Sequence, residues 1–158
     1  MRPIRFECEA SLPYEPEEIA RLILDLSLWP NFGSYGILPG IRSATFERQT
    51  PDVVGTRIRV VNTDGSTHTE EIEEWAPGER IRLRLASFSP PLSRLAPCFI
   101  ETWEFLPSRS GSRVARKFEL IPRSVLARPA LWLISVLLKR AIQRHLRLIK
   151  ESRSTATA

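Results

Sequence analysis

Three segments of the chain place charged side chains on the same face of an expected strand as apolar ones, a pattern that could build a reactive or ligand-binding site. His68 and Glu70 alternate with Ile72 at every second residue. Glu101 and Arg116 each alternate with aromatic or aliphatic residues in two later segments. Alternate residues of a strand point to the same face of a sheet. We therefore expect these four side chains on the covered face, where they could orient a ligand or act as an acid/base pair.

A structural role is the simpler explanation for each of these groups, and we favour it. Glu101 and Arg116 fall on neighbouring strands, so they could form a buried or rim ion pair that satisfies only itself. His68 follows a turn at residues 64–65 and could lie at a strand end, partly in solvent. The other histidine, His145, falls among the basic residues of the last helix and is expected at the surface. No residue is therefore assigned a catalytic role.

Several uncharged side chains are further candidates for the wall of a cavity, although each could also belong to ordinary core packing. These candidates are Tyr35, Phe88, Trp103, Phe118, Leu131, Trp132, Ser135 and Leu138. Leu131, Ser135 and Leu138, together with Ile142, define the face of the last helix that we expect to point into the cavity. The Ser135 hydroxyl lies in an apolar run and could bond back to its own helix or meet a polar group of a ligand.

No motif for metal, phosphate or nucleophile chemistry is present. The sequence lacks the GxGxxG, GxxxxGK[ST], HExxH and GxSxG patterns. The two cysteines, Cys8 and Cys98, stand apart from any CxxC pair and from any histidine at metal-ligand spacing. We therefore expect neither a metal ion nor another cofactor.

Composition and charge indicate an ordinary globular chain. With 158 residues, 42% of them hydrophobic and 26% charged, we expect one domain over residues 1–152 and a disordered tail over 153–158. The net charge of +5 would suit nucleic acid or an anionic membrane. The basic residues are scattered, however, which favours a solvated face and argues against a nucleic-acid partner. Nothing in the sequence indicates an oligomeric state.

The location of the protein is expected to be cytoplasmic. The chain begins with charged residues where a signal peptide would be apolar, and its two thiols suit a reducing compartment. The apolar run at 125–138 has 14 residues and contains Arg128 and Pro129. That run is too short for a transmembrane segment and is better explained as a buried helix, which leaves only a peripheral membrane contact open.

Period-two alternation dominates the middle of the chain. It appears first at 3–12, and from residue 41 onward it predicts strands at 41–49, 55–62, 67–75, 80–88, 99–106 and 113–121. Short turns between consecutive strands make them antiparallel. Residues 89–98 are too long and too rich in proline for a hairpin, and their leucines indicate a loop packed over another part of the protein.

Helical spacing brackets these strands. A helix should begin at Pro16 and end near Trp29, because Pro30 disfavours helical geometry in the residue before it. The last long stretch, 124–151, begins apolar nearly all round and ends amphipathic, so we expect its first half to be covered and its second half partly exposed. The order predicts an α+β fold: a curved antiparallel sheet of about seven strands wraps a long C-terminal helix, with one or two short helices after the first strand.

Four segments resemble the START-like, or SRPBCC, superfamily, which includes polyketide cyclase/dehydrase and lipid-transfer proteins with the helix-grip fold. The segments are the 16–32 helix with its Trp-Pro-Asn-Phe ending, Val-Gly-Thr-Arg at 54–57, the Glu-Trp-Ala-Pro-Gly-Glu-Arg turn within 72–81, and the closing helix. Together the resemblance covers roughly residues 3–151. These motifs consist of packing and turn residues, so they indicate a fold and not an activity.

The resemblance implies a hydrophobic cavity between the sheet and the long helix that binds a small hydrophobic molecule or a lipid without a catalytic step. One alternative is a polyketide cyclase/dehydratase-like enzyme, in which Glu101, Arg116, His68 or Tyr35 would place and protonate the substrate. An unpaired acid or base in the cavity would favour it. The other alternative is an interaction module, in which the 89–98 loop and the basic helix end meet a membrane or a partner protein. An exposed apolar patch would favour that alternative.

Overall fold

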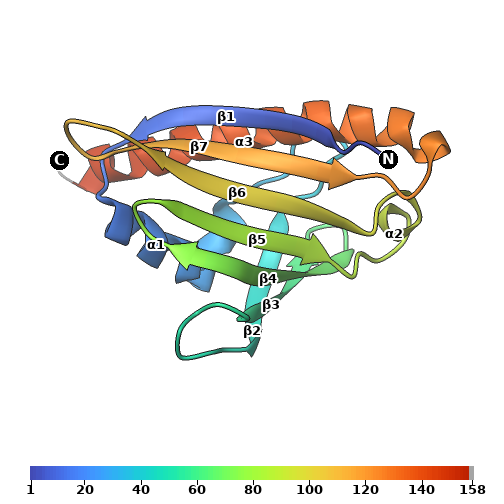
Figure 1. Ribbon diagram of the computed structural model, residues 1–158, viewed down its shortest axis with the longest axis horizontal. Helices are drawn as coiled ribbons and strands as arrows, with labels where there is room; N and C mark the ends of the chain where they lie inside the picture. The colour runs from blue at the N-terminus through green and yellow to red at the C-terminus, as the bar shows by residue number, and fades with distance from the viewer. Residues whose placement is uncertain (157–158) are drawn as a thin grey trace.

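The computed structural model describes residues 1–156, with side chains as far as Arg153. One seven-stranded antiparallel sheet forms the first layer, and a long helix, α3, forms the second (Figure 1). The strands lie in the order β1-β7-β6-β5-β4-β3-β2. Their bounds are β1 Ile4–Leu12, β2 Ile41–Arg48, β3 Arg57–Asn62, β4 Thr67–Ala76, β5 Arg80–Ala86, β6 Cys98–Leu106 and β7 Ser112–Ile121. The predicted α+β helix-grip fold is confirmed.

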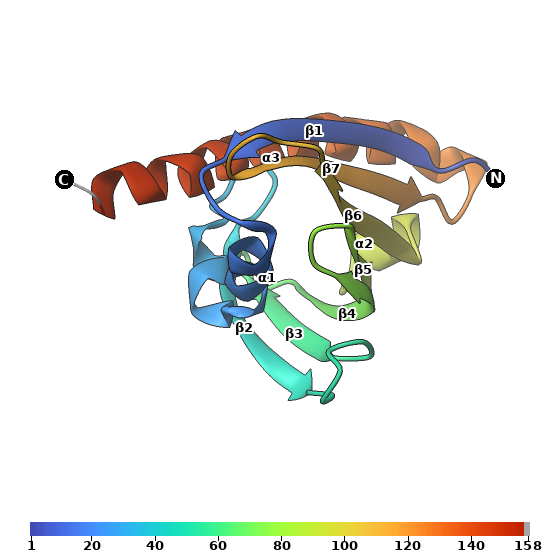
Figure 2. The same ribbon diagram turned by 60° about the vertical axis from the view of Figure 1, so that its left-hand side comes forward.

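Curvature of the sheet creates the space in which a site can form. Strands β1 and β7 lie beside α3, while β2 and β3 curl away from it, so that the sheet wraps around a central space (Figure 2). Register shifts in the β2–β3 and β4–β5 pairs mark irregularities in the ladder. Bulges of this kind bend a strand and increase its twist, which suits a sheet that must curl.

The outer face of the sheet is polar, as the period-two alternation predicts. Cross-strand ion pairs cover it, including Arg5 with Glu119 at 2.6 Å and Lys117 with Glu104 at 2.6 Å. These side chains remain substantially exposed to solvent, so each pair contributes little to stability. Their main consequence is to leave only the inner face of the sheet apolar enough to pack against a helix.

Helix α3 spans Arg128–Ala156 and packs against β1. A 3-10 turn, η2 (Val125–Ala127), leads into it, and the Ser124 side chain accepts a hydrogen bond from the Ala127 amide. Helix α3 includes residues 153–156 of the segment expected to be a disordered tail, and residues 157–158 of that prediction lie outside the described residues. Among the described residues, no helix is long and apolar enough to cross a membrane.

The start of α3 corrects the expectation that its apolar half is covered. Leu126 is 92% exposed and Trp132 is 62% exposed, and Val125 and Leu133 are exposed as well. Leu131, between them in sequence, is fully buried. The sheet lies on one side of the helix only, so a helix that is apolar all round leaves part of its surface uncovered.

Three short helical segments close the ends of the fold. Helix α1 (Pro16–Leu24) stops earlier than predicted, and a 3-10 helix, η1 (Leu26–Asn31), follows because Asp25 ends one and caps the other. The 89–98 loop contains a single turn, α2 (Leu92–Leu95), whose leucines are partly buried against the core. The expectation of a packed loop is confirmed.

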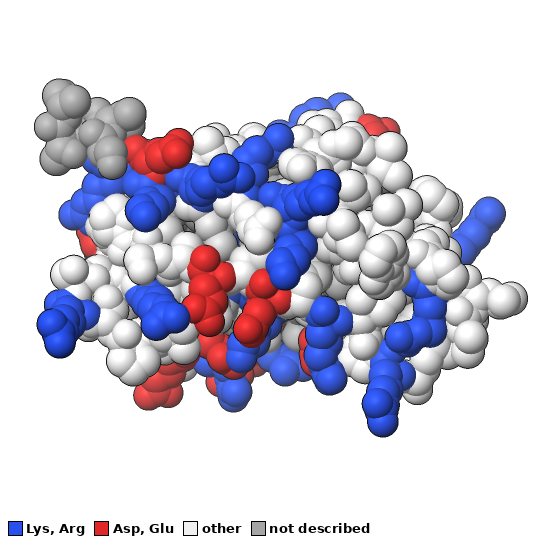
Figure 3. Space-filling view, turned by 90° about the horizontal axis from the view of Figure 1, so that it is seen from above, with Lys and Arg blue, Asp and Glu red and all other residues white. Residues whose placement is uncertain are grey.

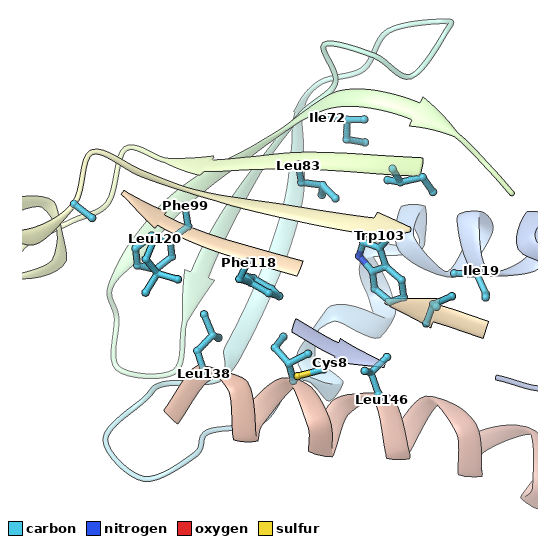
Figure 4. Close-up of a cluster of buried hydrophobic side chains, with 14 of the residues drawn as sticks. Cys8, Ile19, Ile72, Leu83, Phe99, Trp103, Phe118, Leu120, Leu138 and Leu146 are labelled. Carbon is cyan, nitrogen blue, oxygen red and sulfur yellow. The ribbon is translucent and has the colours of Figure 1, made fainter. Parts of the chain in front are cut away.

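The hydrophobic core lies between the inner face of the sheet and α3. Figure 4 shows Trp103 and Phe118 extending from the sheet toward the helix, and Leu138 and Leu146 extending back from it. Cys8 on β1 lies between these two layers and is buried. Packing in this core holds α3 against β1 and β7. The space between α3 and strands β4 and β5 is filled less completely by side chains.

Candidate functional site

A cavity of about 840 Å³ lies between the inner face of the sheet and α3. Side chains from β3 to β7, α1, η1 and α3 line it, and most of them are apolar. Ile37, which is 81% exposed, also belongs to the lining, so the cavity reaches the surface beside the 33–40 loop. A cavity of this size and character is typical of sites for small organic ligands.

Eight of the eleven predicted site residues line this cavity. They are His68, Glu70, Phe88, Glu101, Trp103, Arg116, Phe118 and Leu138. Period-two alternation predicted six of them, because strands β4, β6 and β7 present alternate residues to the covered face. Their role in ligand binding remains a prediction.

Glu101 and Arg116 form a buried ion pair across β6 and β7. The Arg116 Nε donates to Glu101 Oε1 at 2.8 Å, and Nη2 donates to the same oxygen at 2.5 Å. The two side chains are only 9% and 7% exposed. The guanidinium carbon also lies 4.3 Å from the centre of the Trp103 ring, where the ring face attracts a cation. The favoured structural explanation of this pair therefore agrees with the geometry.

Burial sets the electrostatics of Glu101. Removal from water raises the pKa of its carboxyl above the usual range, and the charge of Arg116 opposes that rise. The charge of Glu70, on the same face of the sheet, raises the pKa further. Two carboxylates and one guanidinium thus share the inner face.

His68 and Glu70 form a second polar pair on β4. His68 Nε2 lies 3.0 Å from Glu70 Oε1, and the side chains are 10% and 8% exposed. His68 is the second residue of β4 and so lies at a strand end as expected, but its side chain is mostly buried and not partly in solvent. The β3–β4 turn lies beyond it, and the ring of Phe88 packs near it with centroids 5.9 Å apart. This aromatic cover from the end of β5 could not be derived from the position of His68 in sequence.

His145 is the site residue that the sequence analysis missed. It was expected at the surface, but it lines the cavity, and its Nδ1 lies 3.0 Å from Arg116 Nη1. Burial, together with the nearby charge of Arg116, lowers the pKa of His145 to about 3. The signal was available: Leu138, Ile142, His145 and Ile149 are spaced by three and four residues, which places His145 on the apolar face of the helix.

Three predicted residues lie outside the cavity. Tyr35 packs in the 33–40 loop beneath Arg144, whose guanidinium carbon is 5.2 Å from the ring centre. Leu131 is buried in the core, and the Ser135 hydroxyl donates to the Trp132 carbonyl of its own helix at 2.6 Å. The helix face at the cavity is therefore rotated from the predicted one and carries Ile134, Leu138, Ile142, His145 and Ile149. The exposed Trp132 does not line the cavity either.

Most of the buried polar side chains at the cavity have partners within the protein. Every fully buried polar side-chain atom in the described part of the chain has a hydrogen-bond partner. No cluster of histidine, cysteine and carboxylate side chains in that part could hold a metal ion. The polar groups inside the cavity mostly satisfy one another.

Comparison with known proteins identifies the family of this chain. Residues 3–152 match the model of the family described as polyketide cyclase/dehydrase and lipid transport. The chain belongs to this family. No curated protein sequence matches it. Membership agrees with the helix-grip fold and with the START-like resemblance.

Solved structures with the family's fold resemble the chain over nearly its whole length. TTHA0849 from Thermus thermophilus aligns with a TM-score of 0.71 and 20% identity, over 98% of this chain and 100% of that one. The di-domain ARO/CYC protein BexL aligns with a TM-score of 0.70 and 13% identity, over 94% of this chain and 49% of that one. Ara h 8.0201 aligns with a TM-score of 0.61 and 16% identity, over 91% and 97%. At such low identity these likenesses show the fold alone.

Proposed function

We propose that the protein binds a small hydrophobic molecule or lipid in the cavity between the sheet and α3, without a catalytic step. The observation that carries this proposal is a cavity of about 840 Å³ with a mostly apolar wall, in which Arg116 pairs with Glu101 and His68 contacts Glu70. An apolar wall favours ligands that lose contact with water on entering. The family description, which includes lipid transport, supports the same conclusion.

A cyclase or dehydratase activity is less well supported. Of the four residues that could place and protonate a substrate, Tyr35 lies outside the cavity, and Glu101 and Arg116 are paired with each other. His68 contacts Glu70 at hydrogen-bond distance. An acid/base catalyst needs a group that is free to exchange a proton with substrate, and of these four only His68, through its Nδ1, has a nitrogen outside these pairs. The fold shared with the ARO/CYC protein BexL keeps the enzyme as the alternative to be tested.

Native mass spectrometry of the freshly purified protein tests the binding function. A stoichiometric lipid or aromatic compound that co-purifies, identified after solvent extraction, would support it. The apo protein would then be incubated with a mixed set of lipids and aromatic polyketide-like compounds. Turnover of any compound in that set, seen as a new product mass, would favour the enzyme instead.

A matched pair of α3 variants locates the ligand. Ile134→Trp adds bulk at a residue that lines the cavity and should abolish binding, whereas Leu133→Trp adds the same bulk at an exposed neighbour outside it. Both proteins should keep the far-UV circular dichroism of the wild type. Equal binding by both variants, or no binding of any compound by the wild type, would contradict the proposal.

An interaction surface is the second candidate, and a specific patch favours it. Val125 and Leu126 in η2 and Trp132 and Leu133 in α3, here called the α3 start patch, are all exposed. The sequence between Glu119 and Glu151 contains no acidic residue and seven basic ones. Figure 3 shows blue lysine and arginine side chains beside a broad uncharged area over this end of α3. Apolar side chains flanked by basic ones suit an anionic membrane surface.

The patch corrects one part of the predicted interaction module. The 89–98 loop, which was expected to contact the membrane or partner, packs its leucines against the core instead. Sedimentation with phosphatidylserine vesicles, compared with phosphatidylcholine vesicles, tests the surface. The double variant Leu126→Ser/Trp132→Ser should lose binding, while Phe46→Ser, at an exposed position on β2, should retain it. Equal sedimentation of both variants would exclude the patch.

A further inference from the structure

The contact between Arg116 and His145 fixes where the imidazole carries its proton. A guanidinium has only N–H donors and no acceptor. Arg116 Nη1 therefore donates to His145 Nδ1 at 3.0 Å, and Nδ1 must present its lone pair. A neutral imidazole has one N–H. That proton must consequently lie on Nε2.

The surroundings hold this tautomer firmly. Arg116 is anchored on its other side by Glu101 and lies over the Trp103 ring. The His145 ring packs edge-on against Phe32, with centroids 5.5 Å apart. Burial and the Arg116 charge lower the pKa of His145 to about 3, so the ring is neutral at physiological pH. These contacts hold the ring and the guanidinium in their relative orientation.

The Nε2–H of His145 is left without a partner. No hydrogen bond from it exists within the described part of the chain, whereas every fully buried polar side-chain atom there has one. Nε2 is therefore accessible, and the residue lines the cavity. A donor in a mostly apolar cavity favours a ligand that supplies an acceptor.

We propose that the cavity selects a neutral amphipathic ligand whose hydroxyl, phenol or carbonyl oxygen accepts a hydrogen bond from His145 Nε2, with its hydrocarbon part against the apolar wall. This inference rests on the proposed binding function and adds the chemical class of the ligand. His145 is then a specificity-determining residue, and Arg116 is the residue that positions it.

The charges in the cavity argue against an anionic head group. The charge of Arg116 is already compensated by Glu101, and Glu70 adds a second carboxylate on the same face. His68 lies against Glu70 and faces that carboxylate. A fatty acid or phosphate would bring another negative charge into a poorly solvated space that holds no uncompensated cation from these groups, which costs free energy. A ligand whose oxygen atom is uncharged avoids this cost.

The first test examines the tautomer without any ligand. The two imidazole nitrogens of His145 have distinct ¹⁵N chemical shifts that report which one carries the proton. In the apo protein at pH 7, we expect a protonated Nε2 and an unprotonated Nδ1. A proton on Nδ1, or a doubly protonated ring, would overturn the inference.

The second test uses three probes of nearly equal size: 2-naphthol, 2-methylnaphthalene and 2-naphthoate. One hydrogen bond in a cavity contributes up to about tenfold in affinity, so 2-naphthol should bind up to about tenfold more tightly than 2-methylnaphthalene. The anionic 2-naphthoate should bind most weakly. Titration calorimetry measures all three.

Variants of His145 separate selection from binding. His145→Phe should reduce the preference for 2-naphthol to about onefold while 2-methylnaphthalene still binds. His145→Gln can accept from Arg116 and donate into the cavity, so it should retain much of the preference, and Gln143→Phe, on the exposed side of α3, should change nothing. If His145→Phe keeps the preference for 2-naphthol over 2-methylnaphthalene, the inference is overturned, but the proposed binding function still stands. If none of the three probes binds to the wild type, both the proposed binding function and this inference are overturned.

Discussion

Strand β7 carries two arginines, three residues apart, that illustrate how differently the two faces of the sheet behave. Arg113 lies on the outer face and pairs with Glu9 at 2.8 Å, with its side chain 53% exposed. Arg116 lies on the inner face, is almost fully buried and connects Glu101 with His145. The same residue type is a solvated surface charge at one position and the centre of a polar network at the other. Period two in the sequence places the two arginines on opposite faces, and the layer that covers each face gives them their different environments.

The largest expected effect comes from removing the buried arginine. Arg116→Met should lower the free energy of unfolding by about 3–5 kcal/mol, because it leaves the Glu101 carboxylate buried without its partner. Arg113→Met should change it by less than about 1 kcal/mol, since its partner Glu9 remains in water. Urea denaturation of both variants measures the difference. Similar losses in both would mean that the inner face is as well solvated as the outer one.

Two apolar residues of helix α3 show the same contrast between a buried and an exposed position. Leu131 is fully buried, whereas its neighbour Trp132 is mostly exposed. Leu131→Ala should lower the free energy of unfolding by about 2–5 kcal/mol, because a cavity remains where the side chain was. Trp132→Ala should change it by no more than about 0.5 kcal/mol, as for other surface substitutions. A large loss at Trp132 would show that the α3 start patch is covered in solution.

A pH titration of stability tests the environment of His145. Its pKa of about 3 in the folded protein lies below the ordinary value near 6.5 of an unfolded chain, so the unfolded state binds this proton first as pH falls. Stability should therefore be lost as pH falls from 6.5 toward 3, by up to about 1.4 kcal/mol per pH unit.

The variant His145→Gln isolates this contribution, since it lacks the titrating group. The raised pKa of Glu101 acts in the opposite direction, because the folded state then binds a proton more readily than the unfolded state. That contribution is common to both proteins. The difference between the wild-type and variant stability curves should thus grow below pH 6.5, and parallel curves would place His145 in solvent.

The smallest effect is expected on the outer face. A double-mutant cycle on Arg5 and Glu119, which lie 2.6 Å apart, should give a coupling free energy of about 0.2–1 kcal/mol. Added salt should reduce it further, because exposed charges are screened. A coupling above this range, insensitive to salt, would remove the contrast between the two faces.

The sequence alone determined the architecture and eight of the residues that line the cavity. Strict alternation at positions such as Arg80 to Leu85 requires a sheet with one covered face, and the long apolar stretch after residue 124 requires a helix to cover it. Because side chains in a strand alternate with a period of two, Glu101 and Arg116 could be assigned to the same covered face before their contact was known. The apolar surroundings in sequence predicted that they would pair.

The tertiary structure decided what no local pattern contains. Its spacing from Leu138 and Ile142 could place His145 on the apolar face of α3, but only the contact with Arg116 on another element fixes its tautomer. Burial and the Arg116 charge then keep the ring neutral. Trp132 lies in a run that any hydropathy scale would bury, yet the sheet contacts only one side of α3. Burial depends on which element lies opposite a side chain, and that arrangement is set by the packing of distant segments.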